Sequence, residues 1–337
     1  GVDQVLSYVQ NGMMVCMDAQ QGVIVVEPDD VTLKEHQRKE VLFKENKEKL
    51  RELRATPTVT KSGKRIRLCV NVRSIEDIKK AGEYHVDGVG LFRSEFLYIE
   101  NTHFPTEEEQ FCVYAQAAKL CKEELTIRTL DIGGDKALPY FTLEPEQNPY
   151  LGFRAIRISL EMKDIFKQQL RAILRASVYG NVRIMFPMII SLEELRQAKQ
   201  LVEECKSELK AEGIRYDEHI ELGMMIETPA SVLLASDFAK EADFFSIGTN
   251  DLTQYLLAVD RGNKKVATFY TYFHPAVLTA VEHVIKAGHE NHISVGMCGE
   301  MAGDINATSL LLSFGLDEFS VSGENIDFVR EKIIKWE

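Results

Sequence analysis

Four arginines, Arg93, Arg128, Arg154 and Arg261, lie at or near the ends of short apolar runs in this sequence. An arginine side chain is a planar cation whose paired N–H groups fit a phosphate or a carboxylate. Each arginine alone is most simply a surface residue. If the fold gathers them together with Lys136, their charges repel one another unless an anion lies between them. The five residues therefore predict a site for a small anionic ligand.

Two carboxylates follow two neighbouring apolar runs: Glu227 comes after 221–226, and Asp251 comes shortly after 244–247. If the runs are adjacent parallel strands, both carboxylates lie at one edge of the sheet, too close to remain charged without a cation. Ligands that are all oxygen favour Mg²⁺ over zinc. The alternatives are a carboxylate pair that shares a proton, or helix capping by Asp251.

Cys298 differs from the other five cysteines, which lie in apolar or helical runs. The glycines Gly296 and Gly299 beside it would let a ligand approach closely. A thiol in this position can act as a nucleophile or as a general acid. Since no histidine neighbours it in the sequence, we favour an acid that protonates carbon.

These residues need a scaffold, and the sequence between them alternates short apolar runs with helical patterns, as in parallel α/β folds. The predicted helices include 153–179, 192–212 and 275–290. Eight strands in about 280 residues fit a TIM (β/α)₈ barrel, whose functional residues follow the strands. An open doubly wound sheet is the alternative. The predicted strands are 68–72, 88–92, 125–130, 182–186, 221–226, 244–247, 294–297 and 318–321.

The first 57 residues have a different texture. Two short strand patterns, 13–17 and 23–26, are too small for a core of their own, and we interpret residues 1–30 as the remnant of an upstream domain. Residues 31–57 are charge-dense with spaced leucines and end at Pro57, which predicts a helical linker. The barrel domain is then 58–337.

Composition excludes several classes of function. The formal charge of −12 disfavours nucleic acid and anionic lipid as partners. No apolar run approaches the roughly 20 residues of a membrane helix. Six cysteines without paired spacing favour a reducing, cytoplasmic setting. The glycines at 88 and 90 lack the third glycine of a dinucleotide fingerprint, and no phosphate loop of the GxxxxGK type occurs, which argues against a direct ATP site.

Seven motifs together resemble enzyme I, the phosphoenolpyruvate–protein phosphotransferase family of the sugar phosphotransferase system. They run in family order through most of residues 58–323. They are GVGLFRSEFL (88–97), RTLDIGGDK (128–136), NPYLGFRA (148–155), ETPA (227–230), SIGTNDLTQ (246–254), DRGN (260–263) and GMCGEMAGD (296–304).

The resemblance implies a barrel that binds phosphoenolpyruvate and Mg²⁺ and forms a homodimer. In the family, a set of arginines with one lysine and one asparagine binds the phosphate and carboxylate of the substrate. Glu227 and Asp251 would bind Mg²⁺, and Cys298 would give a proton to C3 of enolpyruvate. The implied substrate-binding residues are Arg93, Arg128, Lys136, Arg154, Asn250 and Arg261.

In the family, a histidine in a GG-x-(S/T)-SH loop of the N-terminal half accepts the phosphoryl group. This sequence has no such loop, and it also lacks the region that docks the carrier HPr. Residues 1–30 resemble the end of that phosphohistidine domain. We therefore expect the chain to bind substrate and to need a separate N-terminal half for turnover. Two alternatives are the related barrel of pyruvate phosphate dikinase and phosphoenolpyruvate synthase, and a non-catalytic dimer that senses phosphoenolpyruvate.

Overall fold

The computed structural model describes residues 5–18, 22–121, 123–134 and 138–337. The chain divides into two compact units, Gly1–Arg54 and Ala55–Glu337. In the first unit, β1 and β2 form an antiparallel pair, and Asp29 caps the following long helix by accepting the Thr32 N–H at 2.8 Å. The elements of this unit are α1 (Val5–Tyr8), β1 (Val15–Asp18), β2 (Val23–Val26) and α2 (Asp30–Glu52).

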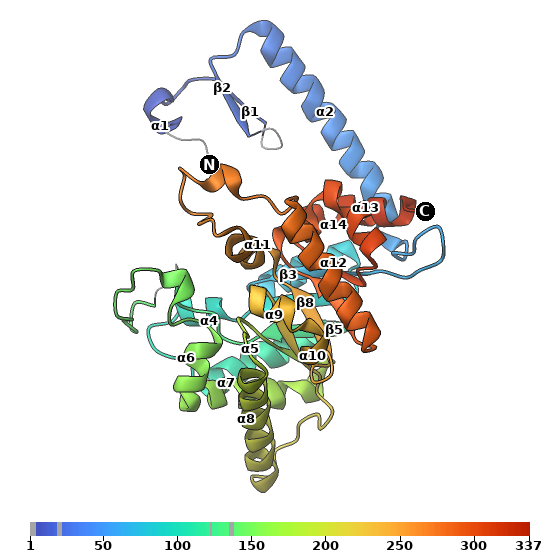
Figure 1. The fold of residues 1–337 in the computed structure, drawn as a ribbon. Coiled ribbons are helices and arrows are strands. Elements are labelled where there is room, and N and C mark those ends of the chain that lie inside the picture. Colours follow the sequence, from blue (N-terminus) through green and yellow to red (C-terminus); the bar gives the residue numbers. More distant parts are fainter. Residues whose placement is uncertain (1–4, 19–21, 122, 135–137) are drawn as a thin grey trace. The chain divides into compact units, whose positions relative to one another are not determined.

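The second unit is a closed barrel of parallel strands surrounded by helices (Figure 1). The strands follow one another around the barrel in chain order, and β10 closes the ring by pairing with β3. This confirms the predicted (β/α)₈ barrel and excludes the open sheet. The strands are β3 (Arg67–Val72), β4 (Gly88–Arg93), β5 (Glu124–Arg128), β6 (Val182–Phe186), β7 (Leu222–Ile226), β8 (Phe244–Ile247), β9 (Ser294–Met297) and β10 (Glu318–Val321).

Helices cover the outside of the barrel, and several begin at side-chain caps. Thr106 and Glu109, for example, form a reciprocal capping box at the start of α5. Within the described residues, no helix is both long and apolar enough to cross a bilayer. The helices are α3 (Ile75–Ala81), α4 (Glu95–Ile99), α5 (Glu107–Leu120), α6 (Ile156–Glu161), α7 (Lys163–Ala176), α8 (Leu192–Ala211), α9 (Pro229–Leu233), α10 (Ala235–Phe238), α11 (Thr249–Leu257), α12 (Pro275–Glu290), α13 (Ile305–Phe314) and α14 (Ile326–Lys335).

Short 3₁₀ segments end or link several of these elements. They are η1 (Leu53–Ala55), η2 (Gly82–Tyr84), η3 (Pro149–Leu151), η4 (Ser177–Tyr179), η5 (Ala267–Phe269), η6 (Glu300–Gly303) and η7 (Gly323–Asn325).

Two predicted elements of the barrel unit differ from the structure by more than one residue. The single helix expected over 153–179 is broken into α6, α7 and η4, because Met162 leaves the helical region (φ −97°, ψ 60°). Strand β5 ends at Arg128, two residues before the predicted end at 130. The cause is local: the Leu130 N–H donates to the side chain of Gln169 at 2.8 Å.

Side chains alternate between two apolar clusters along the strands. Ile184 and Phe186 of β6 pack outward in the large cluster shared with the helices. Met185, between them, belongs to a small cluster inside the barrel that also contains Met225 and Cys298. The interior cluster therefore separates the carboxyl ends of the strands, where the predicted site lies, from their amino ends.

Candidate active site

Arginines and carboxylates alternate around the carboxyl end of the barrel in one continuous chain of ion pairs. Successive nitrogen–oxygen distances lie between 2.7 and 3.5 Å. These ion pairs link the arginines that end β4 and β5 with side chains from the loops and helices that follow the strands. Its order is Arg93, Glu95, Arg128, Asp131, Arg154, Asp251 and Arg261.

The two central arginines are almost fully buried, and burial alone opposes their charge. For Arg128, this desolvation is outweighed by the Glu95 and Asp131 carboxylates, which raise its pKa. For Arg154, it is outweighed by Asp131 and Asp251 in the same way. Both side chains are therefore permanent cations inside the protein.

This arrangement corrects one step of the sequence argument. The arginines do not need an external anion to offset their repulsion, because Glu95, Asp131 and Asp251 already lie between them. The first two residues of that trio were visible in the sequence beside Arg93 and Arg128, but no role was assigned to them. A carboxylate two or three residues from a strand-end arginine is the signal that would have found them.

Several polar atoms in this region have no hydrogen-bond partner among the described residues, although they are buried. They include Nε of Arg128 and of Arg154, Oγ1 of Thr129 and of Thr249, and Oδ1 of Asp251. A buried donor or acceptor without a partner costs about 1–3 kcal/mol. Such atoms gathered at one end of a barrel indicate a place for a polar ligand.

The two ends of this series of ion pairs are exposed to solvent. The side chains of Arg93 and Arg261 are 34% and 32% exposed. Arg93 also lies over the ring of Phe96, 4.8 Å from its centroid. The structure therefore brings the four predicted arginines together, with two buried and two at the rim. Lys136 lies outside the described residues.

Asn250 is next to Asp251 at the start of α11 and joins the loops that follow β8 and β9. Its Oδ1 accepts the Glu300 N–H at 2.8 Å, and its Nδ2 donates to the Glu300 carboxylate at 3.2 Å. The main-chain oxygen of Asn250 accepts the Tyr270 hydroxyl at 3.1 Å. Asn250 therefore holds the loop that carries Cys298 beside the one that carries Asp251.

Glu227 and Asp251 form the predicted pair of carboxylates. Burial, with the nearby charges of Asp251 and Asp131, raises the pKa of Glu227 to about 8. Asp251 does not cap α11, since that helix has Gly248 at its N-cap position and Asp251 in its first turn. The capping alternative is therefore wrong.

The oxygen atoms of this pair suit a hard cation such as Mg²⁺. Oε1 of Glu227 accepts the Met188 N–H at 2.7 Å, which fixes the carboxylate. Its second oxygen, Oε2, has no hydrogen bond among the described residues. A side chain at Gly248 would come within 3.0 Å of that second oxygen, so the glycine keeps the space beside it open. The buried Oδ1 of Asp251 accepts no hydrogen bond among the described residues and has only an ion-pair contact with Arg261 at 3.5 Å.

Cys298 lies at the end of β9, in the wall of the barrel interior. Burial raises the pKa of its thiol to about 11, against the opposing effects of the neighbouring Ser246 side chain and the charge of Arg128. The thiol is therefore protonated near neutral pH, which suits a proton donor better than a thiolate nucleophile. Asn71 fixes the cysteine by donating to its main-chain oxygen at 2.9 Å, and Ser320 holds Asn71 at 2.7 Å.

Two residues beside the site have left-handed backbone angles that side chains rarely adopt. Ala155, directly after Arg154, has φ 51° and ψ −123°, and Met188, whose N–H holds Glu227, has φ 57°. Such conformations cost about 1–3 kcal/mol each and concentrate at functional sites. No pattern in the sequence signals them.

A second buried group of charges lies at the opposite, amino end of the strands. Arg183 of β6 donates to Glu124 of β5 at 2.6 Å and lies 3.4 Å from Glu318 of β10, while Arg67 pairs with both carboxylates. Together with Cys69, these carboxylates could geometrically hold a metal ion. Two arginines already neutralise them, and burial raises the pKa of the Cys69 thiol well above its usual value. This group is therefore a poor cation site.

Comparison with known proteins places this chain in a family. Residues 47–337 match the family model described as "PEP-utilising enzyme, PEP-binding domain", where PEP is phosphoenolpyruvate. The chain is similar to proteins named phosphoenolpyruvate-protein phosphotransferase from several bacteria. It is 48% identical to the one from Priestia megaterium over 99% of this chain and 58% of that protein.

Two other relatives of the same name give similar values. Identity is 44% for the Mycoplasma capricolum protein, over 100% of this chain and 59% of the relative. It is 45% for the Haemophilus influenzae protein, over 99% and 58% respectively. The chain thus spans somewhat more than half the length of these relatives. It belongs to the phosphoenolpyruvate-binding domain family of phosphoenolpyruvate-utilising enzymes.

Proposed function

We propose that this chain binds phosphoenolpyruvate together with Mg²⁺ at the carboxyl end of its barrel. With a separate N-terminal half, it would transfer the phosphoryl group to a histidine and release pyruvate, as the first step of the sugar phosphotransferase system. The observation that carries the proposal is the alternating chain of four arginines and three carboxylates beside a protonated, buried thiol. The names of the relatives support this chemistry over a dikinase.

The arginines would hold the negative groups of the substrate. The buried Nε atoms of Arg128 and Arg154 offer donors with no partner among the described residues. Arg93 and Arg261 at the rim, with Asn250 and the predicted Lys136, would complete the contacts to phosphate and carboxylate. Fixed cations in a buried site stabilise the charge that shifts during phosphoryl transfer.

Glu227 and Asp251 would hold Mg²⁺. When bound, the ion would neutralise part of the negative charge on the phosphoryl group. Because the pKa of Glu227 is raised to about 8, its carboxyl group would give up a proton as the cation binds.

Cys298 would act after phosphoryl transfer. The enolpyruvate that remains needs one proton at C3, and the thiol holds one well above neutral pH. The S–H bond breaks as the new C–H bond forms, and the resulting thiolate then regains a proton from water. Leu91, Met185 and Met225 surround this end of the interior and restrict the access of water to the thiol.

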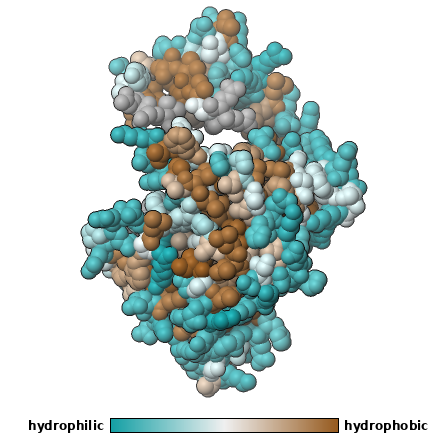
Figure 2. Space-filling model, in the orientation of Figure 1, coloured by the Kyte–Doolittle hydropathy of each residue, from teal (hydrophilic) through white to brown (hydrophobic). Residues whose placement is uncertain are grey.

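The wider setting belongs to the same proposal. Residues 1–30 would be the end of a phosphohistidine domain, 31–57 a linker and 58–337 the substrate-binding barrel. HPr would accept the phosphoryl group from the N-terminal half in the cytoplasm. The barrel would form a homodimer. Figure 2 shows hydrophobic residues on one face of the barrel unit. Large apolar side chains of this unit are also strongly exposed, among them Leu151, Leu233 and Phe269 at 63%, 80% and 67%.

Reconstitution tests the proposal. A separately produced N-terminal half from a relative is mixed with this chain, phosphoenolpyruvate, Mg²⁺ and HPr, and pyruvate is measured. We expect pyruvate only when both halves are present. Pyruvate from this chain alone, or no pyruvate from the mixture although both halves are folded, would contradict the proposal that pyruvate formation needs both halves.

A further inference from the structure

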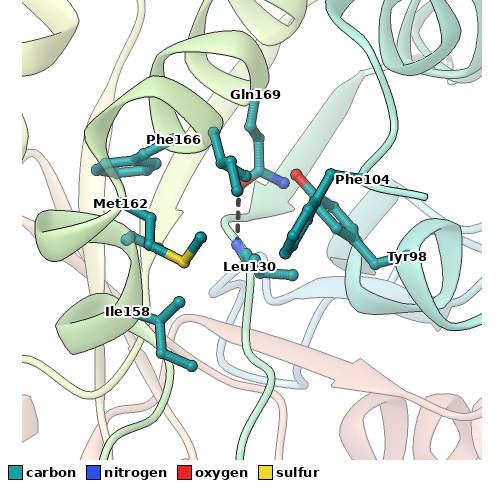
Figure 3. A pocket seen from close by; sticks show the side chains of 9 residues that line it. Tyr98, Phe104, Leu130, Ile158, Met162, Phe166 and Gln169 are labelled. Atoms are coloured by element: carbon teal, nitrogen blue, oxygen red, sulfur yellow. Dashed lines mark hydrogen bonds between the residues drawn. The ribbon is translucent and has the colours of Figure 1, made fainter. Parts of the chain in front are cut away.

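Gln169 lies on α7 behind the strand ends that carry Arg93 and Arg128, and it is fully buried. It borders a small cavity of about 10 Å³ with mostly apolar walls (Figure 3). The cavity can hold no more than about one water molecule. Figure 3 shows the side chain among Tyr98, Phe104, Phe166 and Leu130, with a hydrogen bond to Leu130. A primary amide in such surroundings needs a structural or functional reason.

The hydrogen bonds of Gln169 have only one consistent direction. A main-chain N–H can only donate, so the Leu130 N–H at 2.8 Å fixes the Gln169 oxygen on that side. The NH₂ group then donates to the hydroxyls of Ser94 at 3.0 Å and Tyr114 at 3.2 Å. Ser94 in turn donates to the main-chain oxygen of Arg128 at 2.6 Å.

The outer branch of this network ends away from the site. Tyr114 donates to Oε1 of Gln110 at 3.1 Å, and Tyr98 donates to the same oxygen at 3.1 Å. The Gln110 amide donates to the Pro105 main-chain oxygen at 2.9 Å. Each donor group in this branch has an acceptor, so the direction set at Leu130 is maintained throughout.

The inner branch connects two segments of the ion-pair chain. Ser94 follows Arg93 directly, and Leu130 lies two residues after Arg128. Gln169 therefore bonds to the loop after β4 and the loop after β5 at once, and through Ser94 it fixes the Arg128 carbonyl. A change in the direction of its NH₂ group would release that carbonyl.

We propose that Gln169 is a positioning residue for substrate binding: its amide keeps Ser94 donating to Arg128, and so holds the Arg93–Glu95–Arg128 part of the site in place. This inference rests on the proposed function, because it assumes that these arginines bind phosphoenolpyruvate. Gln169 itself acts only through Ser94 and Leu130.

The variant Gln169→Glu tests the direction of the bonds with almost no change in shape. A carboxylate can still accept the Leu130 N–H, but its other oxygen also accepts, so Ser94 turns to donate to it and leaves Arg128. Burial and the nearby Glu95 will raise the pKa of the new carboxyl group. Once protonated, it donates again and restores the original order. The hydroxyls of Tyr98 and Tyr114 stay protonated throughout, because burial raises their pKa.

We therefore expect a pH-dependent defect. Phosphoenolpyruvate affinity is measured by calorimetric titration in the presence of Mg²⁺. The ratio of the affinity of Gln169→Glu to that of the unchanged protein should be near one at about pH 6 and about tenfold lower at about pH 8.5. Because both proteins are compared at the same pH, the effect of ligand ionisation on affinity cancels in this ratio. A ratio that is the same at both pH values would overturn the proposal.

Two further variants make the result specific. Ser94→Ala removes the hydroxyl that holds Arg128 and should weaken binding several-fold at every pH. Tyr98→Phe removes a hydroxyl from the outer branch and should leave affinity unchanged. If Tyr98→Phe weakens binding as much as Ser94→Ala, the network acts only on stability and the proposal is wrong.

Nuclear magnetic resonance of the ligand-free protein separates this inference from the proposed function. In Gln169→Glu, the amide signals of Thr129, whose nitrogen is bonded to the Arg128 carbonyl carbon, should shift with pH, because that carbonyl loses and regains its donor. Unmoved signals would reject the inference even if the unchanged protein binds phosphoenolpyruvate. Moving signals without any binding would instead reject the proposed function and leave the positioning role intact.

Discussion

The two ends of the barrel contain the same kinds of side chain in different states. At the amino end, Arg67 and Arg183 pair with Glu124 and Glu318, and none of their buried side-chain atoms is left without a partner among the described residues. At the carboxyl end, arginines and carboxylates also pair, but several of their buried atoms lack partners. Buried charge alone therefore does not mark a site; incompletely satisfied charge does.

Two glycines show the same difference between the amino end and the carboxyl end of the barrel. At the amino end, a side chain at Gly90 would meet Oε1 of Glu318 at 2.6 Å, so the glycine makes room for a carboxylate of the protein itself. At the carboxyl end, Gly248 keeps open the space beside Oε2 of Glu227, which has no hydrogen bond among the described residues. The first arrangement fills space, and the second leaves space for a ligand.

The largest expected effect separates two buried cysteines. Cys298→Ala should lower pyruvate formation by the reconstituted enzyme by about 10²- to 10⁴-fold, the range for loss of a general acid, while binding of phosphoenolpyruvate is kept. The matched change Cys69→Ala at the amino end should leave both unchanged. Steady-state turnover and calorimetry measure the two properties. Unchanged turnover in Cys298→Ala would remove the proposed acid and favour a sensing module.

The next effect separates two buried arginines. Arg154→Met should weaken phosphoenolpyruvate binding about 100-fold, since a charged group typically contributes about 1.5–3 kcal/mol through its hydrogen bonds. Arg183→Met should leave affinity unchanged but lower the free energy of unfolding by about 3–5 kcal/mol, because Glu124 and Glu318 lose a partner. Calorimetry and urea denaturation distinguish them. Similar losses of affinity in both variants would remove the contrast between the ends.

A smaller effect concerns pH and the amino end. Burial and the charge of Glu318, opposed by Arg183 and Arg67, raise the pKa of Glu124 to about 8 from its usual 4.5. The folded state thus favours the protonated group, whose stabilisation is complete below its unfolded pKa and is lost as pH rises through the folded pKa. Unfolding free energy should fall between about pH 5 and 8, and Glu124→Gln should flatten that fall. An equal slope in both proteins would show that Glu124 is not the cause.

The smallest effect is at Tyr255, whose hydroxyl accepts from Arg154 at 3.2 Å and donates to the main-chain oxygen of Tyr150. Tyr255→Phe should weaken phosphoenolpyruvate binding about fivefold, as expected for one hydrogen bond of about 1 kcal/mol. Stability should change little, because the ring remains. A loss as large as that of Arg154→Met would mean that the hydroxyl contacts the ligand itself.

The sequence predicted the barrel well because its strands are apolar, short and regularly separated by helical patterns. Runs such as 182–186 and 244–247 coincide with β6 and β8. It failed at residues 153–179, where Met162 breaks a pattern that remains apolar on one face. Local periodicity does not contain the tertiary contacts that divide α6 from α7.

For the site, motifs identified the arginines, the carboxylate pair and the cysteine, but they did not show what balances the charges. Glu95 and Asp131 bridge arginines that are distant in sequence, and only the closed barrel brings them together. Gln169 on α7 carries no motif at all. The amino-end charges were also missed, although Glu124 and Glu318 begin apolar strands and could have been noticed there.

Calorimetric titration of phosphoenolpyruvate into this chain, with and without Mg²⁺, tests the central claim most directly. We expect saturable binding of one ligand per chain that Mg²⁺ strengthens, and we expect this effect of Mg²⁺ to be lost in a variant that lacks both the Glu227 and Asp251 carboxylates. Arg183→Met should bind like the unchanged protein. No binding under any condition, or binding that depends on Arg183 and not on Arg154, would contradict a substrate site at the carboxyl end of the barrel.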